Sequence, residues 1–149
     1  MTELMPDLLA YFVRRVPPRE DSADCLSETM IVLWRKRDIL PTAPQEQRAW
    51  AFGVAKKILS NQRRGAIRRH LLGELIREQI RHTTPTNSAS ADTDILRALS
   101  KTDRELVRLI VWDGFPIAEA GALLNLRPGA ARMRYSRAKE RLRDLHSAE

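Results

Sequence analysis

Residues 116–145 read PIAEAGALLNLRPGAARMRYSRAKERLRDL, and their pattern predicts the fold of the C-terminal part of the chain. Pro116 begins a short helical pattern, Asn125 suits the left-handed residue of a turn, and Pro128 suits the first position of a second helix that reaches about Leu145. Two helices joined by a turn of about four residues, the second long and basic, form a helix-turn-helix.

The second helix of this motif has a predicted buried stripe and a predicted reading face. Three-four spacing makes one inward stripe of Ala131, Tyr135, Ala138, Leu142 and Leu145. The opposite face, near the helix start, carries Gly129, Arg132, Met133, Ser136 and Arg137. Because arginine pairs bidentately with guanine, Arg132 and Arg137 are the best candidates for base contact. Phosphates suit Arg134, Lys139 and Arg141, and a merely solvated charged face is the competing interpretation.

The chain is predicted to hold two modules. Residues 82–93, HTTPTNSASADT, are polar and rich in Ser and Thr, as flexible linkers are. On both sides apolar residues recur at helical spacing, and no run alternates with period two. We therefore predict an all-α protein with two small helical domains, 1–81 and 94–149, joined by a flexible linker.

Breaker residues predict where the other helices end. Three helices are expected before Arg69, with prolines bounding a loop over about 39–47. In the second module Leu96 and Leu99 open a helical segment, and Gly114 suits the left-handed position after a helix C-terminus.

A net charge of +7 favours a polyanionic partner, since each neutralised phosphate releases counterions. The basic run from Lys56 to Arg69 follows Trp50 and Phe52 directly, and aromatic rings beside cations suit single-stranded DNA. Either aromatic residue is equally consistent with the core. In contrast, residues 21–34 form an amphipathic helix with acidic residues near its exposed side, which is consistent with protein docking or with the helix dipole alone.

Other classes of protein are disfavoured. No apolar stretch reaches the roughly 18 to 20 residues that cross a bilayer, and the N-terminus lacks signal-peptide features, so we expect a cytoplasmic protein. The single cysteine, Cys25, excludes an internal disulfide and suits a small buried side chain better than a redox sensor. The three histidines lie outside any ligand or catalytic spacing. We expect no catalytic residues, no metal site and no cofactor.

Taken in order, these segments resemble the group IV, or extracytoplasmic-function (ECF), sigma factors of bacterial RNA polymerase. Residues 21–34 are similar to that family's D-A-E-D-L-V-Q-E-T-F-L-R-L-W helix. Residues 48–64, RAWAFGVAKKILSNQRR, are similar to its R-A-W-L-F-x-I-A-R-N-L-L-x-D-x-x-R-R segment. In residues 96–145 the shared positions are Gly114, Ala118, Glu119, Leu124, Gly129, Arg134, Arg137, Ala138 and Leu142.

The resemblance implies a factor that binds core RNA polymerase through its β′ and β subunits, promoter DNA as duplex and as non-template single strand, and commonly an anti-sigma factor. It implies core-polymerase contacts at Asp21, Asp24, Glu28 and Trp34. It implies minus-ten contacts, with melting and capture of a flipped base, at Arg48, Trp50, Lys56, Lys57, Asn61, Arg63 and Arg64. It implies minus-thirty-five contacts at Arg127, Gly129, Arg132, Met133, Arg134, Ser136, Arg137 and Lys139.

The chain departs from the family pattern at several positions. Lys57 stands where Asn is frequent, and Arg127 stands where a Ser would cap the recognition helix, which weakens that cap by about 1 kcal/mol. Gly121 and Ala131 are smaller than usual, which predicts a loosely packed C-terminal core. A stand-alone helix-turn-helix regulator is the alternative function, and it would bind a palindromic duplex site tightly as a dimer.

Overall fold

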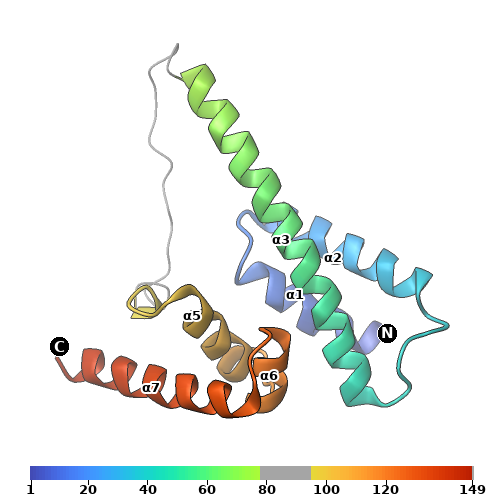
Figure 1. Cartoon of the computed structure of the whole chain (residues 1–149). Helices are drawn as coiled ribbons and strands as arrows, with labels where there is room; N and C mark the ends of the chain where they lie inside the picture. The colour runs from blue at the N-terminus through green and yellow to red at the C-terminus, as the bar shows by residue number, and fades with distance from the viewer. Residues whose placement is uncertain (78–94, 149) are drawn as a thin grey trace. The chain divides into compact units, whose positions relative to one another are not determined.

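The computed structural model describes residues 1–77 and 95–148, and all regular secondary structure in these two ranges is helical (Figure 1). The described residues form two compact units, one on each side of residues 78–94. The predicted all-α class with two helical domains is therefore confirmed. The predicted linker, residues 82–93, lies outside the described residues.

The first unit is a three-helix assembly preceded by one short turn of 3₁₀-helix. Its elements are η1 (Thr2–Leu4), α1 (Met5–Val13), α2 (Arg19–Arg35) and α3 (Pro44–Arg77). Helices α1 and α2 pack against each other and against α3, whose C-terminal half extends beyond them in Figure 1. Thus one end of α3 is part of the core, and the other end projects from it.

Aromatic rings form the centre of this unit. The Tyr11 ring meets the rings of Phe12 and Phe52 edge-on, with centroids 5.3 Å apart in each pair. The buried Arg15 guanidinium donates a 3.1 Å hydrogen bond to the Tyr11 carbonyl and lies 3.9 Å from the Tyr11 ring centroid. Burying this cation is tolerable because it is hydrogen-bonded and faces an aromatic ring.

Helix α3 is longer than the sequence pattern predicts. It begins at Pro44, inside the predicted 39–47 loop, and continues past Arg69 to Arg77. The Ala43 carbonyl accepts a 2.9 Å hydrogen bond from the Gln47 amide, and the proline at the first helical position needs no amide hydrogen of its own. The proline that is expected to bound the loop therefore starts the helix.

The second unit is built from short helices and one long one. Its elements are α5 (Lys101–Val107), the π-helix η2 (Arg108–Trp112), α6 (Ile117–Leu123) and α7 (Pro128–Ser147). Ser100 caps α5, its hydroxyl accepting a 3.2 Å hydrogen bond from the Asp103 amide. Leu96, Leu99, Val107 and Ala138 form one buried cluster, against which Trp112, Tyr135 and Leu142 pack.

Two predictions for this unit need correction. Leu145, predicted to lie in the inward stripe of α7, is 41% exposed, so the described elements leave the last turn of this helix largely uncovered. The prediction of loose packing is also wrong at the place where Gly121 and Ala131 meet. A Cβ on Gly121 would lie only 2.6 Å from the Ala131 Cβ, so the two small residues allow a close approach of α6 to α7.

Candidate nucleic-acid interface

Helices α6 and α7 form the predicted helix-turn-helix. The turn between them is defined by one left-handed residue and one backbone hydrogen bond. Asn125 has φ of 60°, and the Leu126 amide donates a 2.8 Å hydrogen bond to the Gly121 carbonyl. The left-handed residue and this turn hydrogen bond end α6 and redirect the chain into α7 at Pro128. Gly114, with φ of 73°, likewise follows the end of η2 as predicted.

The predicted reading face of α7 is open to solvent. Ala131 and Ala138 are buried against the rest of the unit, whereas Arg132, Met133, Ser136 and Arg137 are exposed. Arg127 and Gly129, at the start of α7, are exposed as well. The structure thus brings the predicted base-contacting residues together on the first half of one helix.

Two predicted DNA contacts on α7 also have partners within the protein. The Arg134 guanidinium donates a 2.9 Å hydrogen bond to Asp103 Oδ1, joining α7 to the first turn of α5. The Lys139 ammonium lies 4.7 Å from the Tyr135 ring centroid. Arg134 therefore holds α5 and α7 together, a role that the sequence does not indicate.

A pocket of about 550 Å³ lies between α2 and α3 in the first unit. Its walls are mostly apolar, and three polar side chains, Lys36, Lys57 and Asn61, line it as well. The remaining lining residues are Val32, Ala49, Trp50, Gly53, Val54 and Ile58. An apolar pocket with a few convergent polar groups is typical of a site for a small organic group.

The structure distinguishes the two aromatic residues that the sequence leaves undecided. Phe52 is 1% exposed and belongs to the aromatic core with Tyr11. Trp50 is partly exposed and lines the pocket, and the Lys36 ammonium lies 5.6 Å from its ring centroid. Of these two rings, Trp50 is therefore the one available to a ligand in the pocket. The sequence does not point to Lys36, because that residue lies beyond the end of α2, far along the chain from the basic run of α3.

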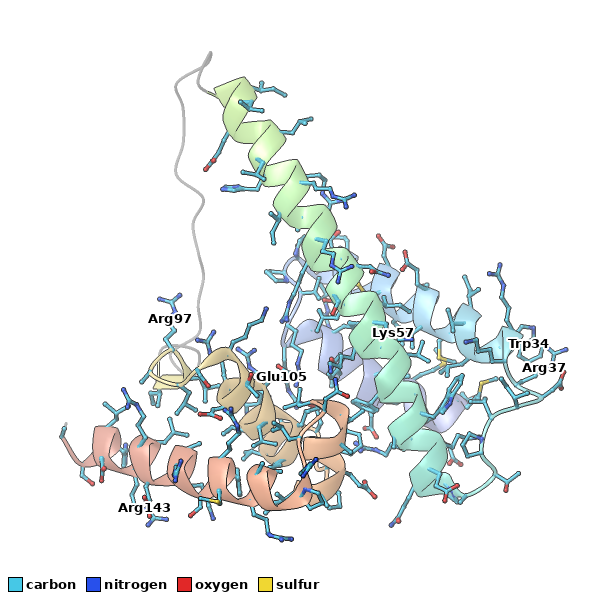
Figure 2. All side chains as sticks on the ribbon, in the orientation of Figure 1. Trp34, Arg37, Lys57, Arg97, Glu105 and Arg143 are labelled. Atoms are coloured by element: carbon cyan, nitrogen blue, oxygen red, sulfur yellow. The ribbon has the colours of Figure 1, made fainter. Side chains whose placement is uncertain are left out.

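The predicted minus-ten residues do not all share one face of α3. Helical periodicity puts Trp50, Lys57, Asn61 and Arg64 on the outward side, in line with the pocket (Figure 2, where Lys57 is labelled). Lys56 and Arg63 project from a different side of the helix. The Arg48 guanidinium lies 4.8 Å from the Phe52 ring centroid, and its Nε lies 3.8 Å from Asp7 Oδ2.

The acidic residues of α2 flank a buried thiol. Asp24 and Glu28 are exposed, whereas Asp21 is partly buried. Burial raises the pKa of the Cys25 thiol, and the carboxylates of Glu28, Asp21 and Asp24 raise this pKa further. The acidic residues of α2 therefore disfavour the charged form of the buried thiol beneath them.

Trp34, near the end of α2, is 59% exposed. The Arg37 guanidinium lies 4.4 Å from its ring centroid (Figure 2). The part of the chain that the structure describes has no cluster of three or more metal-ligating side chains and no helix suited to span a membrane.

Comparisons with known proteins give consistent matches. The family described as "Sigma-70, region 4" matches residues 93–142, which include α6 and most of α7. The ECF RNA polymerase sigma factor SigF of Caulobacter vibrioides is 33% identical over 138 residues, covering 91% of this chain and 76% of the relative. The ECF RNA polymerase sigma factor SigL of Mycobacterium tuberculosis is 25% identical over 142 residues, covering 91% of this chain and 80% of the relative.

Two solved structures share the fold. The sigma factor RpoE, in complex with the anti-sigma factor NepR from Bartonella quintana, has a TM-score of 0.65 and 24% identity, covering 99% of this chain and 96% of that one. CnrH, in complex with the cytosolic domain of CnrY, has a TM-score of 0.69 and 24% identity, covering 99% and 85%. Both likenesses include residues on either side of 78–94.

Proposed function

The chain belongs to the ECF family of RNA polymerase sigma factors, and from this we propose that it binds core RNA polymerase and directs promoter-specific initiation by recognising minus-ten and minus-thirty-five elements. The observation that carries the proposal is the relative that is 33% identical over 138 residues, because that match covers 91% of the chain and so includes both helical units rather than the helix-turn-helix alone.

Minus-thirty-five recognition is assigned to α7. Its exposed first half presents Arg132 and Arg137 beside Met133 and Ser136, and a major groove admits such a helix. Arg127, Gly129, Arg134 and Lys139 surround them and are suited to phosphates or to close backbone approach. Base contacts would supply specificity, and phosphate contacts would supply orientation.

Minus-ten recognition is assigned to the pocket and the outward face of α3. Extruding a base costs a few kcal/mol, and stacking on an aromatic ring returns about 1–3 kcal/mol. Trp50 can supply that stacking, while Lys57, Asn61 and Arg64 follow the strand along the helix. The remaining predicted contacts lie off this face; they are Arg48, Lys56 and Arg63. They would act on the DNA at longer range, or indirectly through the packing of the first unit's hydrophobic core.

Core docking is assigned to the exposed acidic side of α2, with Asp24, Glu28 and the projecting Trp34 as its main contacts. Charge and an exposed aromatic side chain together are typical of protein interfaces. Since the RpoE structure that shares this fold contains an anti-sigma factor, an anti-sigma partner is proposed for this chain too.

The test is assembly followed by transcription. The purified chain is mixed with bacterial core RNA polymerase, separated by gel filtration, and used to transcribe a library of promoter fragments. Co-migration with core and start sites that share two spaced elements support the proposal. Failure to bind core, together with tight binding to a palindromic duplex by the chain alone, contradicts it and favours a stand-alone regulator.

A further inference from the structure

An ion pair at the edge of the second unit joins α7 to α5. The Arg134 guanidinium donates a 2.9 Å hydrogen bond through Nη1 to Asp103 Oδ1. The side chain of Arg134 is 44% exposed, and that of Asp103 is 24% exposed. The pair therefore lies at the surface, and the arginine is the member with more of its side chain in solvent.

The backbone that carries Asp103 is held in place on both sides. Its amide donates a 3.2 Å hydrogen bond to the hydroxyl of Ser100, the residue that caps α5. The next residue, Arg104, donates a 3.1 Å hydrogen bond from its Nε to the Leu96 carbonyl, which ties the preceding segment to α5. The Asp103 carboxylate is thus a defined anchor point for the guanidinium of Arg134.

Arg134 is the middle residue of a row of arginines along one flank of α7. Arg127, Arg134 and Arg141 are seven positions apart, so they follow each other on one side of the helix at intervals of about 10 Å. Helical periodicity places this row next to the buried residues Ala131 and Ala138, at the border of the exposed reading face. When a helix enters a major groove, its flanks face the phosphates, and the row therefore suits a phosphate backbone.

A guanidinium can bind a carboxylate and a phosphate at the same time. It carries five N–H donors in a planar fork, and the bond to Asp103 uses one of them. An exposed arginine without an anchor must lose the freedom of several rotatable bonds before it can hold a phosphate. The bond to Asp103 has already restricted that freedom, so the anchored guanidinium loses less when it binds.

We propose that Asp103 is a positioning residue for duplex DNA, which orients Arg134 so that its guanidinium bridges α5 and a phosphate beside α7. The proposal rests on the proposed function, in that it takes α7 as the helix that binds the duplex. It gives a DNA-binding role to an acidic residue outside the predicted contacts. Simple electrostatics requires the opposite effect, because removing a carboxylate near DNA relieves repulsion and strengthens binding.

The test measures the affinity of the full chain for a fluorescent duplex of about 30 base pairs of random sequence, over a range of salt concentrations. Asp103→Asn removes the charge and keeps the size of the side chain. It should weaken duplex binding about fivefold, because the oriented charge-assisted contact is lost. The slope of log affinity against log salt should become shallower by about one, which corresponds to one lost phosphate contact.

Glu140→Gln is the matched control, because it removes an exposed carboxylate from α7 itself. It should leave the affinity unchanged or raise it. Arg134→Met should reproduce the losses of Asp103→Asn, and the double variant should lose no more than Arg134→Met alone, because both residues act through one contact. Asp103→Glu keeps the carboxylate and should restore most of the affinity.

A second probe and a folding control separate this contact from other effects. A fluorescent oligothymidine strand reports binding to the basic side of α3, and all variants should bind it alike. Exposed ion pairs contribute little to stability, so the variants should stay folded, which circular dichroism at the assay temperature checks.

Two results overturn the proposal. In the first, the affinity of Asp103→Asn rises as electrostatics requires, which would mean that Asp103 only repels DNA. In the second, Asp103→Asn and Arg134→Met keep the wild-type salt slope, which would mean that the pair only joins two helices. Because duplex binding needs no polymerase, failure to assemble with core polymerase would refute the proposed function and leave this test intact.

Discussion

Gly121 and Ala131 bring α6 and α7 together within the helix-turn-helix. A side chain on Gly121 would place its Cβ 2.6 Å from the Ala131 Cβ, closer than two non-bonded carbon atoms can lie. Gly121→Ala should therefore destabilise the second unit by up to about 2 kcal/mol, since overpacking costs about 1–3 kcal/mol and the higher helix propensity of alanine offsets about 1 kcal/mol of this.

The measurement is urea unfolding followed by Trp112 fluorescence in a background where Trp34 and Trp50 are replaced by Phe, so that only the second unit is reported. Gly129→Ala is the matched control, because a Cβ added at that position would meet nothing within 4 Å and stability should not fall. Equal unfolding midpoints for the two variants would contradict the tight contact.

The thiol of Cys25 should titrate at higher pH in the folded chain than in the unfolded one, because burial and three carboxylates raise its pKa. A raised pKa contributes stability that is fully present below the ordinary thiol pKa and is lost as the pH rises through the raised value. Iodoacetamide labelling of this single cysteine, followed against pH with and without urea, tests this. A native inflection at or below the unfolded one would contradict it, and Cys25→Ser gives the unlabelled baseline.

The structural roles of some residues can be predicted from sequence, because these roles depend only on the local backbone conformation. Gly114 and Asn125 adopt positive φ as predicted, since few other residues tolerate that conformation. Trp50 and Phe52 cannot be separated, because they are two positions apart on one helix and only tertiary packing decides which is buried. The role of Arg134 is hidden for the same reason, since Asp103 is 31 positions away.

At the level of elements, α7 begins without a side-chain cap, because its N-cap residue is Arg127. Arg127→Ser should stabilise the second unit by about 0.5–1 kcal/mol, as its hydroxyl can accept a hydrogen bond from an unpaired amide of the first turn. The same Trp112 unfolding assay measures the gain. An unchanged midpoint would mean that solvent already satisfies this turn.

The elements that escape prediction lack a local signature. The π-helix η2 changes the hydrogen-bond register over Arg108–Trp112. The sequence does not indicate this change, because the spacing of its apolar residues is the same as that of an α-helix. The projecting half of α3 is not predicted because its aliphatic residues do not continue the core-facing stripe. Helix type and approximate position follow from periodicity, whereas register and length depend on packing.

The reading face of α7 should be sensitive to Arg137. Arg137→Ala should cost about 1–3 kcal/mol at the minus-thirty-five element and relax base preference there, because a bidentate contact to guanine is lost. Transcription by the reconstituted holoenzyme from promoters varied at each minus-thirty-five base measures this. Arg141→Ala, another exposed arginine on α7, should weaken all sequences alike. A uniform loss for Arg137→Ala would refute its base-reading role.

For the whole molecule, charge is segregated along the chain: the described part of the first unit places acidic residues on α2 and basic residues on the outward side of α3. The unit therefore presents surfaces of opposite charge on its two longest helices. If α2 is the polymerase-docking element, reversing one of its exposed charges should reduce assembly with core polymerase without disturbing the hydrophobic core of the unit. Glu28 is suitable because it lies outside the buried residues of α2, which are Ser22, Cys25, Thr29 and Leu33.

Glu28→Arg should therefore weaken assembly with core polymerase about tenfold, as the loss of an attractive charge and the gain of a repulsive one together reach about one to a few kcal/mol at a protein interface. The helical circular dichroism signal and oligothymidine binding should be unchanged.

Titration of labelled chain with core polymerase measures the affinity, and Glu3→Arg, an exposed charge reversal outside α2, is the control. Because screening weakens charge interactions, the difference between the two variants should shrink as salt rises. If both assemble as well as wild type at low salt, docking must lie elsewhere, and the acidic residues of α2 would then serve only its helix dipole and the Cys25 environment.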